Sequence, residues 1–210
     1  MPLRKSGIED RGLSMTRWTR PNARLALAAW VFASTASVLL AFLIVRMLVD
    51  PAGGKANPVV SSVVGVAGIG LLLPLAQWGI LRQFLPKSHH WIVASLAGVS
   101  LGLAIDLALS SLGVYPIQAL STLGASIAFG IVVGTAQWMY LRRYLPHAIL
   151  WIVASALGWG LMTVTTGMVV EGLLEQFLFG LIPALSTGLA LVYFMHISYR
   201  GTIDGREVAA

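Results

Sequence analysis

Residues 76–101 read AQWGILRQFLPKSHHWIVASLAGVSL, and residues 136–161 read AQWMYLRRYLPHAILWIVASALGWGL. The two stretches are identical at 14 of 26 positions without a gap. Each joins two apolar runs through a short basic turn that contains a proline. The repeated unit is therefore predicted to be a two-helix hairpin, with copies at about residues 62–115 and 122–170.

Including the four runs of these two hairpins, the chain holds six apolar runs that could cross a bilayer as helices. A spanning helix needs about 20 mostly apolar residues. The chain has 210 residues, of which 57% are hydrophobic and only 10% charged, whereas a soluble domain carries roughly 25% charged residues. An all-α membrane bundle of six transmembrane helices is predicted. The predicted spans are residues 25–49, 58–84, 91–115, 118–141, 149–170 and 173–197.

The first and last runs resemble the two halves of a third hairpin. Residues 30–34 read WVFAS, close to the WIVAS after each turn, and residues 186–194 read STGLALVYF, a weak echo of AQWMYLRRY. Spans 25–49 and 173–197 would then close a split third unit. This predicts three parallel hairpins around a pseudo-threefold axis along the membrane normal. Duplication for packing alone is the alternative.

Basic residues predict the orientation of the bundle. With a cytoplasmic N-terminus, 12 of the 14 Lys and Arg residues fall in cytoplasmic segments, and only Arg46 and Lys55 fall outside. Cytoplasmic loops of membrane proteins carry such an excess. We expect a multi-pass protein of the cytoplasmic (inner) membrane with both termini inside. Residues 1–24 would form a basic, partly disordered tail, the transmembrane domain would cover 25–197, and residues 198–210 would form a second tail.

Tryptophans support the same orientation. Five of them fall near predicted cytoplasmic span ends, where the membrane interface favours an apolar ring with an N–H that seeks water or headgroups. These five are Trp30, Trp78, Trp91, Trp138 and Trp151.

The AQWxxLR turn, followed by WxxAS and a stripe of small residues, resembles a loose group of uncharacterised bacterial multi-spanning membrane proteins. The resemblance covers roughly residues 65–165 and implies helical hairpins, without a catalytic residue or an activity.

Small residues recur every four positions within the spans, which places them on one helix face and lets backbones approach closely. Such faces serve a compact bundle or a partner helix equally well. Pro74 and Pro183 lie inside spans and are expected to kink them. The stripes include Ala94, Gly98, Gly102, Ser126, Gly130, Gly134, Gly180, Ala184 and Gly188.

Two charged residues inside the spans are the first site candidates. Asp106 lies 15 residues beyond Trp91, and Arg46 lies 16 residues beyond the equivalent Trp30, so both are expected at one depth in the outer half of the membrane. They could form a structural ion pair, or an ion or proton site. Thr166 occupies the repeat position of Asp106 and is a further candidate for a polar path.

Gln77 and Gln137 are the remaining candidates, each next to a tryptophan just inside the predicted cytoplasmic interface. They are expected to form hydrogen bonds across helices, and a contact with a substrate headgroup is the alternative.

The residue types exclude several function classes. The chain has no cysteine, its four histidines map to one interface, and no hydrolase, metalloprotease or phosphate-loop motif is present. No cofactor, metal or catalytic site is predicted, and the dispersed basic residues give no nucleic-acid surface.

The predicted role is therefore that of a non-enzymatic accessory, assembly or scaffolding subunit. Its expected partners are membrane lipids, together with another membrane protein or a second copy of the chain. The alternative is a small transporter or channel with a polar site around Asp106, and the third interpretation is an intramembrane enzyme.

Overall fold

The computed structural model describes residues 23–49, 58–111, 118–145, 147–168 and 172–207. All regular structure in this part of the chain is helical, which confirms the predicted all-α class. The helices are α1 (Ala23–Val49), α2 (Pro58–Leu81), α3 (His89–Ser111), α4 (Gln118–Leu141), α5 (Leu150–Thr166) and α6 (Leu173–Glu207).

Four of the six helices are long and apolar enough to cross a membrane. These stretches are Ala23–Leu48 in α1, His89–Leu109 in α3, Thr122–Leu141 in α4 and Leu173–Ile197 in α6. The Ala67–Leu81 part of α2 and the whole of α5 are shorter apolar helices.

Several helix ends differ from their predictions: α2 ends at Leu81 rather than 84, α5 ends at Thr166 rather than 170, and α6 differs most. The last helix continues to Glu207, ten residues past the predicted end at residue 197. The apolar run ends near residue 197, but a helix satisfies its backbone hydrogen bonds internally and can continue beyond the apolar layer. The predicted tail at 1–24 lies almost wholly outside the described residues, as does Lys55.

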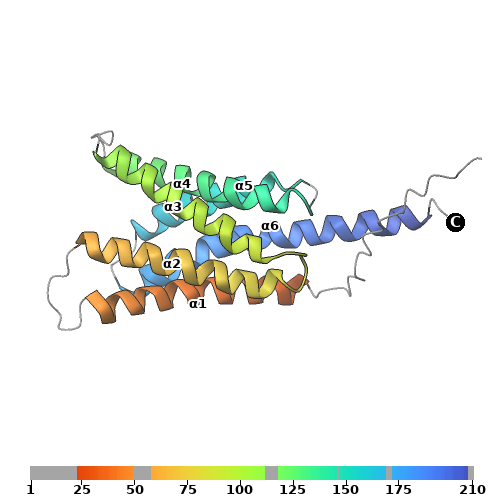
Figure 1. Ribbon diagram of the computed structural model, residues 1–210, viewed down its shortest axis with the longest axis horizontal. Helices are drawn as coiled ribbons and strands as arrows, with labels where there is room; N and C mark the ends of the chain where they lie inside the picture. Colours follow the sequence, from red (N-terminus) through yellow and green to blue (C-terminus); the bar gives the residue numbers. More distant parts are fainter. Residues whose placement is uncertain (1–22, 50–57, 112–117, 146, 169–171, 208–210) are drawn as a thin grey trace, which may run out of the picture.

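The helices form a closed ring. Each packs against its two neighbours in chain order, and α6 returns to pack against α1. Figure 1 shows them running side by side along the long axis of the molecule. The α2–α3 pair packs least closely of the six neighbouring pairs.

Glycines occupy the seams of this ring. A Cβ added at Gly130 of α4 would lie 2.7 Å from the carbonyl oxygen of Ser155 on α5. One added at Gly98 of α3 would lie 2.9 Å from the Cα of Val133 on α4. These distances are shorter than van der Waals contact, so a side chain at either position would force the two helices apart. Gly134, Gly158 and Gly180 face the backbone of a neighbouring helix in the same way. At these five glycines the small-residue faces are thus in contact with helices of the same chain.

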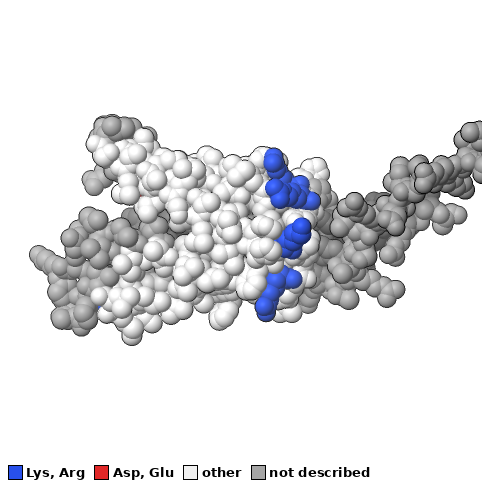
Figure 2. All heavy atoms as spheres, viewed as in Figure 1, with Lys and Arg blue, Asp and Glu red and all other residues white. Residues whose placement is uncertain are grey.

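Basic side chains gather at the end of the ring that holds the α2–α3 and α4–α5 turns. Figure 2 shows Lys and Arg as a band across this end, and the exposed side chains of these turns include Arg82, Lys87, Arg142 and Arg143. The two turns have the same backbone course. Lys87 and His147, which are 60 positions apart, have positive φ values of 50° and 55°.

Candidate functional site: an axial cavity

The ring encloses a cavity of about 830 Å³ that is lined by residues from all six helices. Toward the basic end its lining consists of the buried side chains of Gln77, Gln137, Trp151 and Thr187. Toward the opposite end the lining reaches the half-buried Asp106 and the exposed Thr122. Among the described residues, the lining is therefore buried at the basic end and partly exposed toward the other.

Three tryptophans close the basic end. Trp30, Trp91 and Trp151 come from α1, α3 and α5 and are 0%, 0% and 1% exposed. Their ring centroids are 6.1 Å apart for Trp30–Trp91, 5.8 Å for Trp30–Trp151 and 5.4 Å for Trp91–Trp151. All three pairs meet edge to face, the arrangement that aromatic quadrupoles favour. We refer to Trp30, Trp91 and Trp151 as the tryptophan plug.

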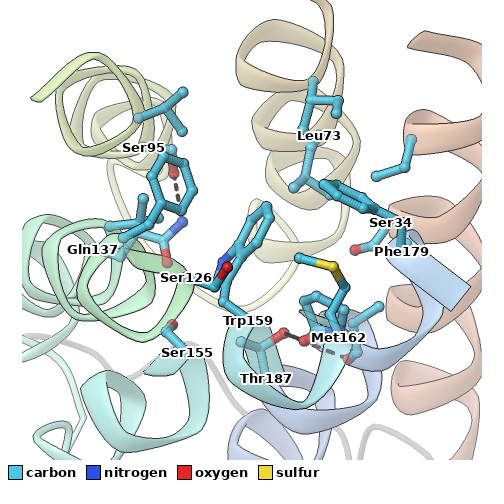
Figure 3. Close-up of a pocket in the computed structure, with 18 of the residues that line it drawn as sticks. Ser34, Leu73, Ser95, Ser126, Gln137, Ser155, Trp159, Met162, Phe179 and Thr187 are labelled. Carbon is cyan, nitrogen blue, oxygen red and sulfur yellow. Dashed lines mark hydrogen bonds between the residues drawn. The ribbon is translucent and has the colours of Figure 1, made fainter. Parts of the chain in front are cut away.

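Two glutamines anchor the plug through equivalent hydrogen bonds. Trp151 donates its indole N–H to Oε1 of Gln137 at 2.7 Å, and Gln137 donates through Nε2 to Oγ of Ser95 at 2.9 Å. Each bond joins two helices, so this glutamine links α3, α4 and α5. Figure 3 shows the Gln137–Ser95 bond at the side of the cavity.

The same arrangement recurs one hairpin earlier. Trp91 donates its N–H to Oε1 of Gln77 at 3.3 Å, and Gln77 donates to Oγ of Ser34 at 3.3 Å, which links α1, α2 and α3. The side chains of Gln77 and Gln137 are 6% and 7% exposed, respectively. Both glutamines therefore form hydrogen bonds across helices.

For the third tryptophan of the plug, a threonine rather than a glutamine accepts the indole N–H, and we call each such Trp–acceptor pair a corner of the plug. Trp30 donates its N–H to Oγ1 of Thr187 at 3.1 Å, and Thr187 donates in turn to the carbonyl oxygen of Pro183 at 2.7 Å. Thr187 lies where the STGLALVYF segment aligns with Gln77 and Gln137. Its shorter side chain does not span to a third helix. Instead the neighbouring Ser186 donates to the carbonyl oxygen of Ala154 on α5 at 2.6 Å.

The tryptophan plug corrects the expectation that the N–H groups of all five tryptophans seek water or headgroups at the interface. Three of them are buried because a glutamine or threonine in the bundle accepts the N–H bond that the interface would otherwise supply. Trp78 and Trp138 are half-buried beside the basic turns. The guanidinium carbons of Arg82 and Arg142 lie 5.3 Å and 4.9 Å from their ring centroids. The repeated spacing of 14 residues between Gln and Trp, present in both hairpins, is the signal that distinguishes the buried Trp91 and Trp151.

The half of the cavity away from the basic end is lined by aromatic side chains. Phe129 of α4 and Trp159 of α5 have ring centroids 4.8 Å apart, and Trp159 and Phe179 of α6 are 5.7 Å apart. Figure 3 shows the Trp159 ring near the centre of the cavity, between the sides that carry Gln137 and Phe179. Both helix-interior prolines, Pro74 and Pro183, also belong to the lining.

Of the five predicted site residues, three belong to the described lining of the cavity and two do not. Asp106, Gln77 and Gln137 line it. Thr166 is half-buried on α5 and donates to the carbonyl oxygen of Met162 at 2.9 Å, outside the described lining.

Arg46, the proposed partner of Asp106, is exposed on α1. In the ring α2 lies between α1 and α3, which carries Asp106. The Arg46–Asp106 ion pair stays a prediction.

No metal centre is found within the described residues, where no group of three or more His, Cys, Asp or Glu side chains could hold an ion. The four histidines, His89, His90, His147 and His196, are exposed.

Comparisons with protein-family models, with curated proteins and with solved structures find no match to the chain.

Proposed function

We propose that this chain is a six-span protein of the cytoplasmic membrane that binds a small, mainly apolar molecule in its axial cavity and carries it across the membrane. The observation that carries the proposal is the cavity of about 830 Å³, which all six helices line and the tryptophan plug closes at one end. Ligand sites in helix bundles are concave, mostly apolar and equipped with a few placed polar groups.

The ring supports six spans rather than four. The apolar helix α5 packs between α4 and α6, and α2 packs between α1 and α3. Each thus lies alongside two helices that are long enough to cross. The 17 residues of α5 extend over about 25 Å at 1.5 Å per residue, near the lower limit for a span.

Three hairpins around a pseudo-threefold axis are supported by the corners of the tryptophan plug. At equivalent positions, Gln77, Gln137 and Thr187 each accept the indole N–H of a tryptophan on the following helix of the ring. For Thr187 this following helix is α1, at the other end of the chain. Such a pattern would follow if α6 and α1 were the split third copy.

Basic side chains around the plug support a cytoplasmic position for the closed end. The turn residues Arg82, Lys87, Arg142 and Arg143 surround this end, and positively charged loops favour the cytoplasmic side. The cavity would then be accessible from the outer side, with the tryptophan plug as its inner closure.

We favour transport over the accessory role that the sequence predicted. That role depends on small-residue faces free to receive a partner helix, whereas Gly98, Gly130, Gly134, Gly158 and Gly180 face helices of the same chain. Opening to the cytoplasm would require the three plug rings to separate. Pro74 and Pro183, where the helices lack a backbone hydrogen bond, lie in the cavity wall and provide points at which α2 and α6 can bend.

Native mass spectrometry of the protein, extracted from its own membranes with lipid, tests this proposal. We expect a single chain or homo-oligomer with a small molecule or lipid bound in a fixed ratio. That molecule should be lost in Ala125→Trp, which fills the cavity from α4. It should be kept in Leu107→Trp, whose side chain is 57% exposed on α3. A stoichiometric protein partner, or a bound molecule unaffected by Ala125→Trp, would contradict the proposal.

A further inference from the structure

The charge of the cavity lining is concentrated at a single residue. Among the described residues that line the cavity, Asp106 is the one with a formal charge at neutral pH. Its side chain is half-buried near the outer end of α3. A carboxylate attracts cations and repels anions, and it does so more strongly where it is half-buried than where water surrounds it fully.

A row of aromatic rings lies one helical turn below this carboxylate. Gly102 precedes Asp106 by four residues on α3, and a Cβ added there would lie 2.6 Å from the Phe129 ring. Phe129 therefore packs directly against α3 at this level. From it the row continues through Trp159 to Phe179, with centroid separations of 4.8 Å and 5.7 Å.

Aromatic rings and a carboxylate together favour one class of ligand. The face of an aromatic ring carries negative charge density and attracts a cation within about 6 Å, and tryptophan does so most strongly. An apolar cation would place its hydrophobic groups among Phe129, Trp159 and Phe179 and its charge within reach of Asp106. An anion would meet both the carboxylate and the ring faces unfavourably.

We propose that the cavity selects lipophilic cations, such as quaternary ammonium or protonated amine compounds with an apolar body. This inference rests on the proposed function, since it names the chemical class that the cavity would take. It assigns Asp106 as the charge-selecting residue and Trp159 as the ring at the centre of the site.

Two ions of nearly equal size and opposite charge provide the test: tetraphenylphosphonium and tetraphenylborate. Their binding to the full chain in nanodiscs of zwitterionic lipid is measured by equilibrium dialysis. Binding to the cavity is taken as the difference in bound probe between the unsubstituted chain and Ala125→Trp. Taking this difference also removes the probe that partitions into the lipid, since both samples contain the same lipid. The neutral triphenylphosphine oxide serves as a third probe.

We expect the cavity to bind tetraphenylphosphonium at least about ten-fold more tightly than tetraphenylborate, an effect within the range of one charge pair. Asp106→Asn should remove most of this preference while the neutral probe still binds, which shows that the variant is folded. Glu175→Gln removes an acid near the same end of the bundle but outside the described lining, and should leave the preference unchanged. Trp159→Leu should weaken binding of the cation more than that of the neutral probe.

Equal or tighter binding of tetraphenylborate in the cavity, or a preference unchanged in Asp106→Asn, would overturn the cation inference and leave cavity binding intact. If none of the three probes shows binding that Ala125→Trp removes, the cation inference is wrong. The result with native membranes then decides separately whether the cavity holds any molecule at all.

Discussion

Substitution of Gly130 by alanine perturbs the closest contact that a described glycine makes with the backbone of another helix. The added Cβ would lie 2.7 Å from the carbonyl oxygen of Ser155 and 2.8 Å from the Cα of Ala156, where ordinary contact begins at 3.4 Å. Both neighbours are backbone atoms, so α4 and α5 must move apart by about 0.7 Å, the difference between 3.4 and 2.7 Å. Overpacking of this kind costs typically about 1–3 kcal/mol. The higher helix propensity of alanine offsets roughly 0.5–1 kcal/mol of that cost.

We therefore expect Gly130→Ala to lower the free energy of unfolding by about 1–2 kcal/mol. Gly79→Ala and Gly124→Ala are the matched controls, because an added Cβ at either position meets nothing within 4 Å. They should be neutral or slightly stabilising. The measurement is unfolding by SDS in mixed micelles, followed by far-ultraviolet circular dichroism. If Gly130→Ala proves as stable as Gly124→Ala, the α4–α5 seam is not as close as described and the argument against a partner helix fails.

Two further predictions concern the anchor of the plug and the loosest seam. Gln137→Leu removes the acceptor of the 2.7 Å hydrogen bond from Trp151. A double-mutant cycle with Trp151→Phe should give a coupling energy of about 0.6–1.7 kcal/mol, from the average to the maximum for hydrogen bonds in membranes. Additive effects on the free energy of unfolding would show that the bond contributes nothing. In this cysteine-free chain, Gly70→Cys with Val99→Cys should form an α2–α3 disulfide on oxidation, because the two Cβ positions are 3.8 Å apart, close to the usual separation of about 3.8 Å. Failure to form it, read as an unchanged gel mobility, would contradict the α2–α3 register.

Local features of the fold could be predicted from the sequence because they depend on neighbouring residues. The apolar runs predicted helices, and the repeated turn predicted two similar hairpins, whose turns have Lys87 and His147 at matching positive φ values. The end of α6 was less predictable, since hydropathy reports where the apolar layer ends and not where the helix ends.

The cavity depends on three-dimensional arrangement, and the sequence predicted it only in part. Asp106 was predicted as a polar site candidate inside the spans, and it lines the cavity. The burial of Trp30 was not predicted, because its partner Thr187 is 157 residues away in the chain. Equal depth suggested that Arg46 would approach Asp106, and this pair stays a prediction, because depth along the membrane does not specify the order of helices around a ring.

Cysteine accessibility tests the proposal that an axial cavity opens to the outer face of the membrane and is closed at the basic end. Ser126 lines the cavity from α4, and Ala128, two residues further on, is exposed on the outside of the ring; two residues turn a helix by about 200°. With a charged, membrane-impermeant thiol reagent, Ser126→Cys should react from the outer side and not from the cytoplasmic side, whereas Ala128→Cys, facing lipid, should react from neither. A Ser126→Cys variant that is as unreactive as Ala128→Cys would show that no cavity opens to the outer face, and one that reacts from the cytoplasmic side would show that the tryptophan plug does not close it.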